Sequence, residues 1–384
     1  MPDPLPVPIQ TMFAELVERA WSSNTGNLTS TGGSAYERVA RGRKYLYWQP
    51  PTIGGKRASP LYIGKDDEKS RKRIQALADT AANLRERRDM VRALRNARLH
   101  APDKTSGDVM AAMAEAGVFR LRAVVVGSVA FQTYPGLLGM RMPAALSRTG
   151  DLDVGQFQSI AVAVEDRIAS DLETVLRKVD DRFTAVPDAF DGRRTMRYAI
   201  RRGQDEIFSV DILSPMRGPE LPRIGSLPAI RSDAQFLRYL DFLLYQEVNS
   251  VALHGAGIPI NVPDPTRYAL HKLTVSQMRL ARDARSQAKA RKDLQQAASL
   301  ITVLAEARPD DLRDLWLELC ERGPSWRRKA MQALSQLPPE IAAALGADLD
   351  PGRGDRDAAS AYVVQAGDEI DETGEDTVQP TWDA

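Results

Sequence analysis

The stretches that decide the fold read LRAVVVGS at residues 121–128, DLDV at residues 151–154 and FSVDIL at residues 208–213. Each is a short run of apolar residues that is interrupted or ended by Gly-Ser or Asp. Short runs of Val, Ile and Leu are typical of buried strands. A further strand is expected over residues 194–201, with helices over residues 109–116 and 165–179. This alternation predicts an α/β (α+β) fold with a small mixed β-sheet.

Three aspartates fall within these predicted strands. Residues two apart on a strand point to the same face, so Asp151 and Asp153 should project together. Two neighbouring carboxylates repel each other, and a divalent cation relieves that repulsion. Asp211 lies inside an otherwise apolar strand, where burying a charge is costly unless the charge binds something. The pattern therefore favours a metal site, although an Asp-x-Asp pair at a strand edge also occurs in turns and helix caps.

The first strand ends in Gly127 and Ser128, after which the chain is expected to enter a helix. Gly allows close approach of the backbone to a ligand, and a hydroxyl with free backbone N–H groups attracts phosphate. Three acids beside such a turn suit metal-assisted nucleotidyl transfer. In that chemistry two Mg²⁺ ions roughly 3.5–4 Å apart hold the attacking and leaving oxygens. We expect Asp153 to bridge the metals, Asp151 to bind the nucleotide metal, and Asp211 to act as ligand and base.

The order of these motifs resembles the polymerase-β-type nucleotidyltransferase superfamily over roughly residues 121–213. One departure is the separation of Ser128 from Asp151 by 22 residues, which is longer than in compact members. An insertion over residues 135–150, expected to be a loop, accounts for the excess. The resemblance implies an NTP substrate and a catalytic core over residues 108–233.

Further along, PDPTRYALHKLTVSQMR and KARKDLQQAASLI are similar to bacterial nucleotidyltransferase-fold proteins related to the AbiEii and MenT toxins. The resemblance implies that Lys272, Lys292 and Asp293 complete the nucleotide site. It also implies an RNA acceptor such as the 3′ end of a tRNA, a toxin-like activity and an antitoxin partner. Read without it, Lys272 could simply extend from its helix to solvent, and Lys292 with Asp293 could be a surface pair.

Charge is distributed unevenly, although the formal net charge is only +1. Residues 37–98 hold 17 Lys and Arg against 7 Asp and Glu, whereas residues 347–384 hold 2 against 11. We therefore predict an N-terminal region over 1–107, with a basic hairpin and an Arg-rich helix, and an acidic disordered tail over 347–384. Residues 234–346 are predicted to form a helical domain, because their pattern is helical almost throughout.

The basic region interleaves cations with aromatic residues, a combination that can hold phosphates and stack bases. The residues that we expect to contact nucleic acid are Arg43, Lys44, Tyr47, Trp48, Lys56, Arg57, Tyr62 and Lys65. Aromatic residues in alternation also pack hairpins onto a core, and this alternative stays open for each ring.

Several function classes are excluded or disfavoured. No apolar run reaches the roughly 18 residues of a membrane span, and the first ten residues have neither the basic nor the apolar region of a secretory signal, so we expect a cytoplasmic protein. A single cysteine excludes an internal disulfide and a cysteine metal cage. A glycosyltransferase that uses the Asp-x-Asp pair is disfavoured, because it needs neither Asp211 nor the Gly-Ser turn. A non-catalytic nucleic-acid-binding protein is disfavoured by the complete set of acids.

Overall fold

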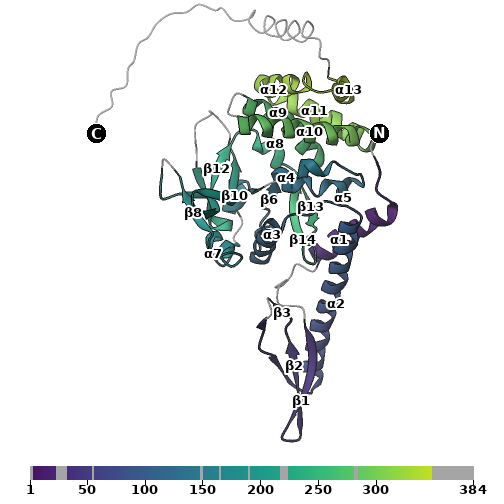
Figure 1. Cartoon of the computed structure of the whole chain (residues 1–384), viewed down its shortest axis with the longest axis vertical. Helices are drawn as coiled ribbons and strands as arrows, with labels where there is room; N and C mark the ends of the chain where they lie inside the picture. The colour runs from purple at the N-terminus through teal and green to yellow at the C-terminus, as the bar shows by residue number, and fades with distance from the viewer. Residues whose placement is uncertain are drawn as a thin grey trace, which may run out of the picture.

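The computed structural model describes residues 3–22, 33–53, 56–147, 150–163, 166–188, 191–216, 224–280 and 284–347. Its main body contains one large mixed sheet, and a slender arm projects from that body (Figure 1). The predicted α/β (α+β) class is confirmed. The predicted acidic tail, apart from Ala347, lies outside the described residues.

The large sheet runs in the order β11-β12-β10-β7-β6-β14-β13, with β9 beside β10 and β8 beside β9. Parallel pairs join β10 to β7, β10 to β12 and β14 to β6, and the other neighbours are antiparallel. The strands span β6 (Val124–Val126), β7 (Asp151–Gly155), β8 (Thr184–Pro187), β9 (Thr195–Arg202), β10 (Asp205–Pro215), β11 (Ile224–Leu227), β12 (Ser232–Leu237), β13 (Glu247–Ala252) and β14 (Ile258–Pro263).

Helices lie on both sides of this sheet (Figure 1). On one side are α9 (Pro265–Leu280), α10 (Ala284–Ala307), α11 (Pro309–Glu321), α12 (Pro324–Leu334) and α13 (Pro339–Leu345). The remaining helices of the body are α1 (Val7–Ser22), α3 (Lys104–Ala116), α4 (Gly127–Phe131), α5 (Tyr134–Leu138), α6 (Gln158–Ala163), α7 (Leu172–Arg177) and α8 (Leu240–Leu244), with 3₁₀ turns over Ala144–Ser147 and Pro228–Ile230. One continuous hydrophobic core joins α3, the sheet and the C-terminal helices. Within the described residues, no helix is long and apolar enough to cross a membrane.

The arm (residues 33–53 and 56–80) carries a separate antiparallel sheet of β1 (Ser34–Ala40), β2 (Arg43–Gln49) and β5 (Leu61–Lys65). A two-residue turn joins β1 to β2, with positive φ at both Arg41 and Gly42, as in the turns that match the twist of a hairpin. A small hairpin of β3 (Thr52–Ile53) and β4 (Lys56–Arg57) lies between β2 and β5. The sheet packs along α2 (Glu68–Asn96), which is about 44 Å long at 1.5 Å per residue.

Arg87 fixes α2 to the body. Its guanidinium is fully buried and donates to the carbonyl oxygens of Ala256 (2.8 Å) and Gly257 (2.6 Å), in the turn between β13 and β14. A second hydrophobic cluster, which includes Val91 and Leu94 of α2 with Phe13 and Leu16 of α1, surrounds this junction. The C-terminal half of α2 is therefore part of the body, while its N-terminal half supports the arm.

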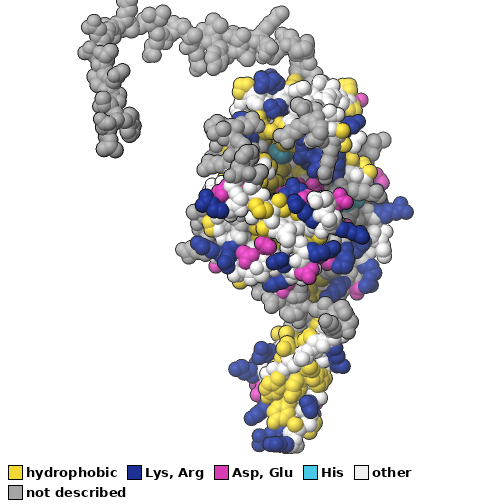
Figure 2. Space-filling model, turned by 60° about the vertical axis from the view of Figure 1, so that its left-hand side comes forward, with side chains coloured by type: hydrophobic (Ala, Val, Ile, Leu, Met, Phe, Trp, Pro, Cys, Tyr) yellow, Lys and Arg dark blue, Asp and Glu magenta, His cyan; other side chains and the backbone are white. Residues whose placement is uncertain are grey.

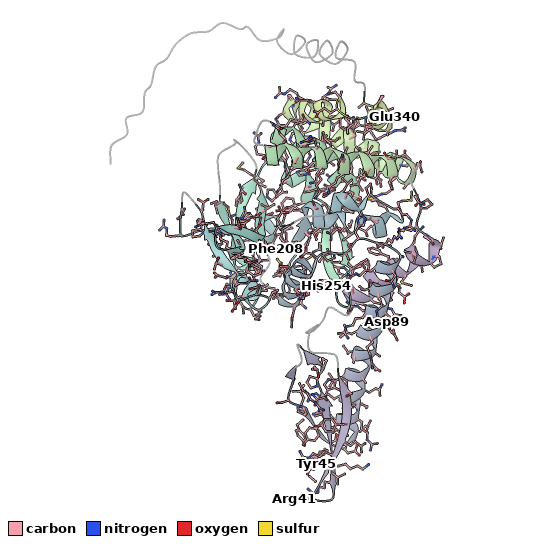
Figure 3. The ribbon with its side chains drawn as sticks, viewed as in Figure 1. Arg41, Tyr45, Asp89, Phe208, His254 and Glu340 are labelled. Carbon is pink, nitrogen blue, oxygen red and sulfur yellow. The ribbon has the colours of Figure 1, made fainter. Side chains whose placement is uncertain are left out.

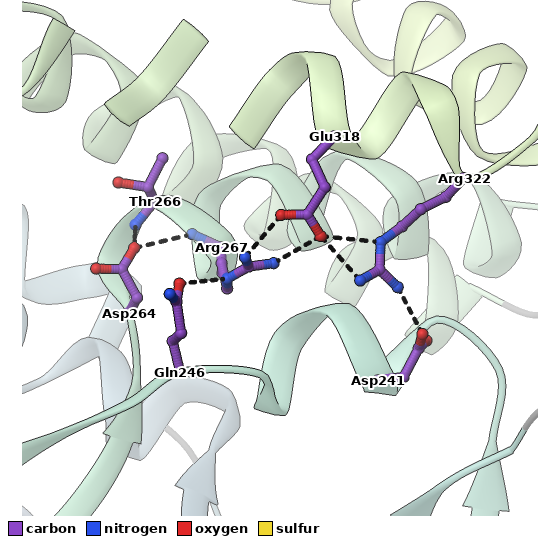
Figure 4. Close-up of polar contacts among 7 residues, drawn as sticks. All are labelled: Asp241, Gln246, Asp264, Thr266, Arg267, Glu318 and Arg322. Atoms are coloured by element: carbon purple, nitrogen blue, oxygen red, sulfur yellow. Dashed lines mark hydrogen bonds and ion pairs between the residues drawn. The ribbon is translucent and has the colours of Figure 1, made fainter. Parts of the chain in front are cut away.

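Charged side chains of α8, α9 and α11 form an ion-pair network (Figure 4). Arg267, which is 2% exposed, binds both carboxylate oxygens of Glu318, at 3.1 Å and 2.7 Å. Arg322 donates to Glu318 (2.8 Å) and to Asp241 (2.5 Å). In this ion-pair network two guanidinium groups meet two carboxylates, so the buried charges are balanced, and bidentate pairs of this kind are the strong ones. The network holds the helical layer against α8.

The structure corrects several sequence predictions. The chain is not helical from residue 234 onward, because β12, β13 and β14 occupy much of residues 232–263. All six residues of β14 are buried, so no alternation marks it as a strand. The predicted helix over 165–179 is wrong at its start, since helix begins only at Leu172, and residue 165 lies outside the described residues. The expected loop over 135–150 contains most of α5 and a 3₁₀ turn, and residues 148–149 are not described.

Candidate active site

The three predicted acids meet at the centre of the large sheet. β7 lies between β6 and β10, and the parallel register pairs Asp153 directly with Asp211. Residues opposite each other in register project from the same face, and Asp151 lies two residues before Asp153. Leu152 and Val154 point to the other face and are fully buried. The alternation in DLDV therefore places all three carboxylates on one side and anchors them with two core residues.

Asp153 has an unusual electrostatic environment. Burial raises the pKa of its carboxyl group to about 7, and the charges of Asp151 and Asp211 add to this shift. Lys272 and Lys289 oppose it by stabilising the carboxylate. Within the described part of the chain, no cation forms an ion pair with Asp153, whereas Asp151 and Asp211 each have one. In the cluster of Asp151, Asp153 and Asp211, which we call the acid cluster, the carboxyl group of Asp153 is therefore the one that holds its proton to near neutral pH.

Asp211 shares its environment with Arg197 of β9. Arg197 lies opposite Asp211 in the antiparallel register, with its Nε 3.4 Å from Asp211 Oδ1. Burial raises the pKa of Asp211, and the Arg197 charge partly offsets this rise. Arg197 also contacts Glu206 and donates to Ser209 Oγ (3.2 Å). The negative charge of Asp211 is thus only partly balanced by the Arg197 guanidinium group.

Gly127 allows the turn after β6 to come close to the acids. Its φ is +66°, in the left-handed region that favours glycine. A Cβ at this position would lie 2.6 Å from Asp153 Oδ2, so the Asp153 carboxylate would have to move away to admit a side chain. The Tyr268 hydroxyl group lies 2.9 Å from the Gly127 carbonyl oxygen and holds the turn from the helical side. Glycine is therefore required both by the backbone conformation and by the neighbouring carboxylate.

Two lysines of α10 reach across to the sheet. Lys292 Nζ donates to Ser128 Oγ at 2.7 Å, and Lys289 Nζ lies 3.1 Å from Asp151 Oδ2. Burial, together with the charge of Lys272, lowers the pKa of Lys292. Because α10 brings these amines over both the Gly-Ser turn and the acids, the site can hold an anion next to a cation-binding carboxylate cluster.

Lys272 and Asp293 form a buried pair between α9 and α10. Lys272 Nζ donates to Asp293 Oδ1 at 2.5 Å, and both residues are less than a tenth exposed. Arg279, seven residues after Lys272, lies 3.4 Å from Asp293 Oδ2. One carboxylate thus faces two cations, so this side of the site carries a net positive charge opposite the acid cluster.

The structure brings all the predicted residues of the core together, namely Gly127, Ser128, Asp151, Asp153, Asp211, Lys272, Lys292 and Asp293. The sequence prediction did not include Arg197 or Arg279. Arg197 could have been noticed as a cation on the strand that precedes the Asp211 strand. Arg279 could have been noticed from its two-turn spacing after Lys272.

The predicted nucleic-acid contacts lie elsewhere, in the arm, and labelled residues Arg41 and Tyr45 mark its far end (Figure 3). Trp48 is 1% exposed and shares its face of the sheet with buried Leu46, so its ring is not available for stacking. Lys44 contacts Glu37 at 3.2 Å. The side chain of Lys56 lies outside the described residues. Arg43, Tyr47, Arg57, Tyr62 and Lys65 remain at least partly exposed.

The acid cluster is a candidate metal site. Among the described residues, no group of three or more Asp, Glu, His or Cys side chains is already arranged to hold a metal ion. Arg197 and Lys289 instead lie against two of the three acids. The donor chemistry nevertheless fits Mg²⁺, which prefers carboxylate oxygens. Burial, and after it the charges of Asp151 and Asp211, raise the pKa of Asp153, and a bound cation would stabilise its carboxylate against both.

Comparisons with known proteins agree with this chemistry. A family model described as Nucleotidyltransferase matches residues 104–321, which is more than half of the chain. A search of curated proteins gave no match. Among solved structures, the chain is similar to an antigenic nucleotidyltransferase-like protein from Paracoccidioides brasiliensis. That likeness has 14% identity and a TM-score of 0.33, covering 65% of this chain and 95% of the other. So low a TM-score supports no inference about this chain.

Proposed function

The chain belongs to this family of nucleotidyltransferases, and from that premise we propose that it transfers NMP from an NTP to RNA in a Mg²⁺-dependent reaction. The observation that carries the proposal is the convergence of Asp151, Asp153 and Asp211 beside the Gly127-Ser128 turn. Carboxylates that crowd together on one side of a nucleotide cradle suit this reaction and serve no evident structural purpose.

Asp151, Asp153 and Asp211 would hold two Mg²⁺ ions. Bound there, the ions would neutralise charge that develops on the phosphoryl oxygens. Lys289 now pairs with one oxygen of Asp151 and would compete with an ion held there. Asp153 would also have to lose its proton, because with a pKa of about 7 its carboxyl group is partly protonated near neutral pH.

The protein's own groups then have distinct roles. Ser128 and Lys292 bind the phosphates of the NTP, and Lys292 exchanges its contact with the Ser128 hydroxyl for one with the anion. Asp211 accepts the proton of the acceptor hydroxyl group as the new oxygen–phosphorus bond forms at the α-phosphate. The bond between the α- and β-phosphates breaks, and pyrophosphate leaves. Lys272 and Arg279 stabilise the charge of this leaving group.

The acceptor is proposed from the charge of the N-terminal region, where 17 cations stand against 7 acids over residues 37–98. A polyanion such as RNA complements that surface. The resemblance to toxin-related proteins supports the 3′ end of a tRNA as acceptor, and with it a toxin-like role controlled by an antitoxin. The contacts of Lys289 and Arg197 with the acids favour a second candidate, a nucleic-acid-binding protein without transferase activity.

A transfer assay separates the two candidates. Each α-³²P-labelled NTP is incubated with total RNA and Mg²⁺, and wild type is compared with Asp211→Asn and Asp205→Asn. Asp205 lies on the same strand, β10, but is exposed, so it is a matched control. We expect label in RNA with wild type and Asp205→Asn, and none with Asp211→Asn or when EDTA replaces Mg²⁺. Absence of label in any RNA or protein with wild type would contradict the proposal.

A further inference from the structure

One face of the arm sheet is lined by tyrosines. Cross-strand register places Tyr36 of β1 and Tyr62 of β5 on either side of Tyr47 in β2, and Tyr45 lies two residues before Tyr47. Residues opposite each other share a face, so these four rings form a surface that we call the tyrosine face. Tyr36 and Tyr47 stack with centroids 5.4 Å apart, and Tyr62 lies 5.4 Å from Tyr47 and 6.2 Å from Tyr45.

The tyrosine face is not the hydrophobic core of the arm. Leu46 and Trp48 occupy the alternate positions of β2 and are 5% and 1% exposed, so they supply the buried side against α2. Tyr36 and Tyr62, by contrast, are 38% and 55% exposed. Figure 2 shows hydrophobic side chains, tyrosines included, gathered on the arm between Lys and Arg side chains. Tyr45 and Tyr47 are partly buried. Four adjacent rings, two of them exposed and two partly so, form a patch that a partner could cover.

Charge on the arm indicates the class of partner. Residues 33–65 contain seven Lys and Arg and a single acid, Glu37. Register places Arg38 and Lys65 opposite Tyr45, and therefore on the tyrosine face, whereas Glu37 lies opposite Leu46 on the buried side. Rings with cations and no acid on one surface suit a polyanion with exposed ring faces, which is an unpaired nucleic-acid strand. A duplex hides its base faces by stacking them on one another.

We propose that the tyrosine face binds unpaired nucleotides of the acceptor RNA by stacking bases on Tyr36, Tyr45, Tyr47 and Tyr62, while Arg38, Arg43 and Lys65 contact phosphates. This inference rests on the proposed function for the identity of the strand. The buried Arg87 contacts at the base of α2 give the surface a fixed place relative to the acid cluster. An RNA strand bound to the arm would therefore approach the body from a fixed direction.

Binding of a fluorescent single-stranded 20-mer RNA to the full chain, without NTP, tests the inference. The variant Tyr36→Ala/Tyr62→Ala is compared with Val39→Ala/Leu61→Ala, which changes the same two strands. Val39 and Leu61 are 64% and 53% exposed but lie on the opposite face. Stacking on an aromatic residue contributes about 1–3 kcal/mol per base. We therefore expect the tyrosine variant to lose affinity by at least about tenfold and the control to stay within about twofold.

Tyr36→Phe/Tyr62→Phe keeps the rings and should retain affinity within about twofold, which distinguishes stacking from a general loss of arm structure. Equal affinity of wild type and the tyrosine variant would overturn the inference, as would tighter binding of a duplex than of the single strand. Tyrosine-dependent binding without any transfer would contradict the proposed function alone. Transfer to RNA that the tyrosine substitutions leave unchanged would overturn the inference alone.

Discussion

The acid cluster and the ion-pair network are two groups of partly or fully buried charges in one body, and they differ in how well their charges are balanced. In the ion-pair network, Arg267 and Arg322 meet Glu318 and Asp241, and each guanidinium donates to a carboxylate. In the acid cluster, three carboxylates share a sheet face, and the pKa of Asp153 rises to about 7. The first arrangement is complete without a ligand, whereas the second becomes more favourable when a cation is added. Charge balance thus distinguishes a group of residues that stabilises the fold from one that binds.

The largest expected effect is on the acid cluster. Asp153→Asn should reduce nucleotidyl transfer by at least about 10²–10³-fold, the loss seen when one electrostatic contact with a transition state is removed. The metal-free variant should unfold at the same temperature as wild type or higher, because a repelling buried charge is gone. Transfer assays and thermal melts in EDTA measure both properties. An unfolded variant would show instead that Asp153 stabilises the fold.

The second effect is on the ion-pair network. Glu318→Gln leaves the buried Arg267 guanidinium without its carboxylate. Because Glu318 is itself 34% exposed, we expect a loss of about 1–3 kcal/mol of unfolding free energy, the cost of an unsatisfied buried donor. Urea denaturation measures this loss. Asp311→Asn, at the half-exposed pair with Arg308, is the control and should cost less than about 1 kcal/mol. Full activity per folded molecule in Glu318→Gln would support a purely stabilising role for the ion-pair network. Loss of activity without loss of stability would contradict that role.

The sequence predicted the acid cluster but not the ion-pair network, for a physical reason. An acid inside an apolar strand is conspicuous, because strands of this kind are otherwise uniformly apolar. Arg267 and Glu318 are separated by 51 residues on helices that carry many other charges, so nothing local marks them as partners. Lys292 and Asp293 were predicted only through a family resemblance.

Some strands could not be predicted from local sequence patterns. β14 is buried on both faces, and its two prolines, Pro259 and Pro263, suggest an interruption and not a strand. β1 is exposed along its whole length and shows no alternation of burial. In both cases pairing with neighbouring strands determines the structure. β14 pairs with β6, which lies far away in the sequence, and β1 pairs along one edge only, with β2. β7 was predictable because its alternation is visible within the strand, and β10 was predictable because it contains a short apolar run that Asp211 interrupts.

The third effect is a dependence of stability on pH. In the native state the pKa of Asp153 is about 7, above the roughly 3.9 of an unfolded chain, so the native state binds this proton more tightly. The stability that the native state gains from this tighter proton binding is fully present below pH 4 and is lost as pH rises through 7. The stability of metal-free wild type relative to Asp153→Asn should therefore fall from pH 4 to pH 7 and then level off. A constant difference in urea denaturation across this range would contradict the assigned environment.

The smallest effect concerns a cation at the edge of the acid cluster. Lys289 is about half exposed in its pair with Asp151, and exposed pairs contribute at most about 1 kcal/mol. Lys289→Ala should therefore leave the unfolding free energy within that margin. Its removal should also make Mg²⁺ bind more tightly, since the ion no longer displaces an ion pair, and calorimetric titration without NTP measures this. Weaker Mg²⁺ binding would show that Lys289 does not compete with the metal.

The continuous α2 helix has a consequence for the size of the acceptor. Half of its roughly 44 Å is docked on the body through Arg87 and the surrounding apolar residues, and the other half carries the tyrosines outward. An RNA that contacts the tyrosines and the acid cluster at once must span the separation between them. Oligonucleotides shorter than this separation would reach either surface but not both. If RNA binds at both surfaces, acceptors would therefore be selected by their length.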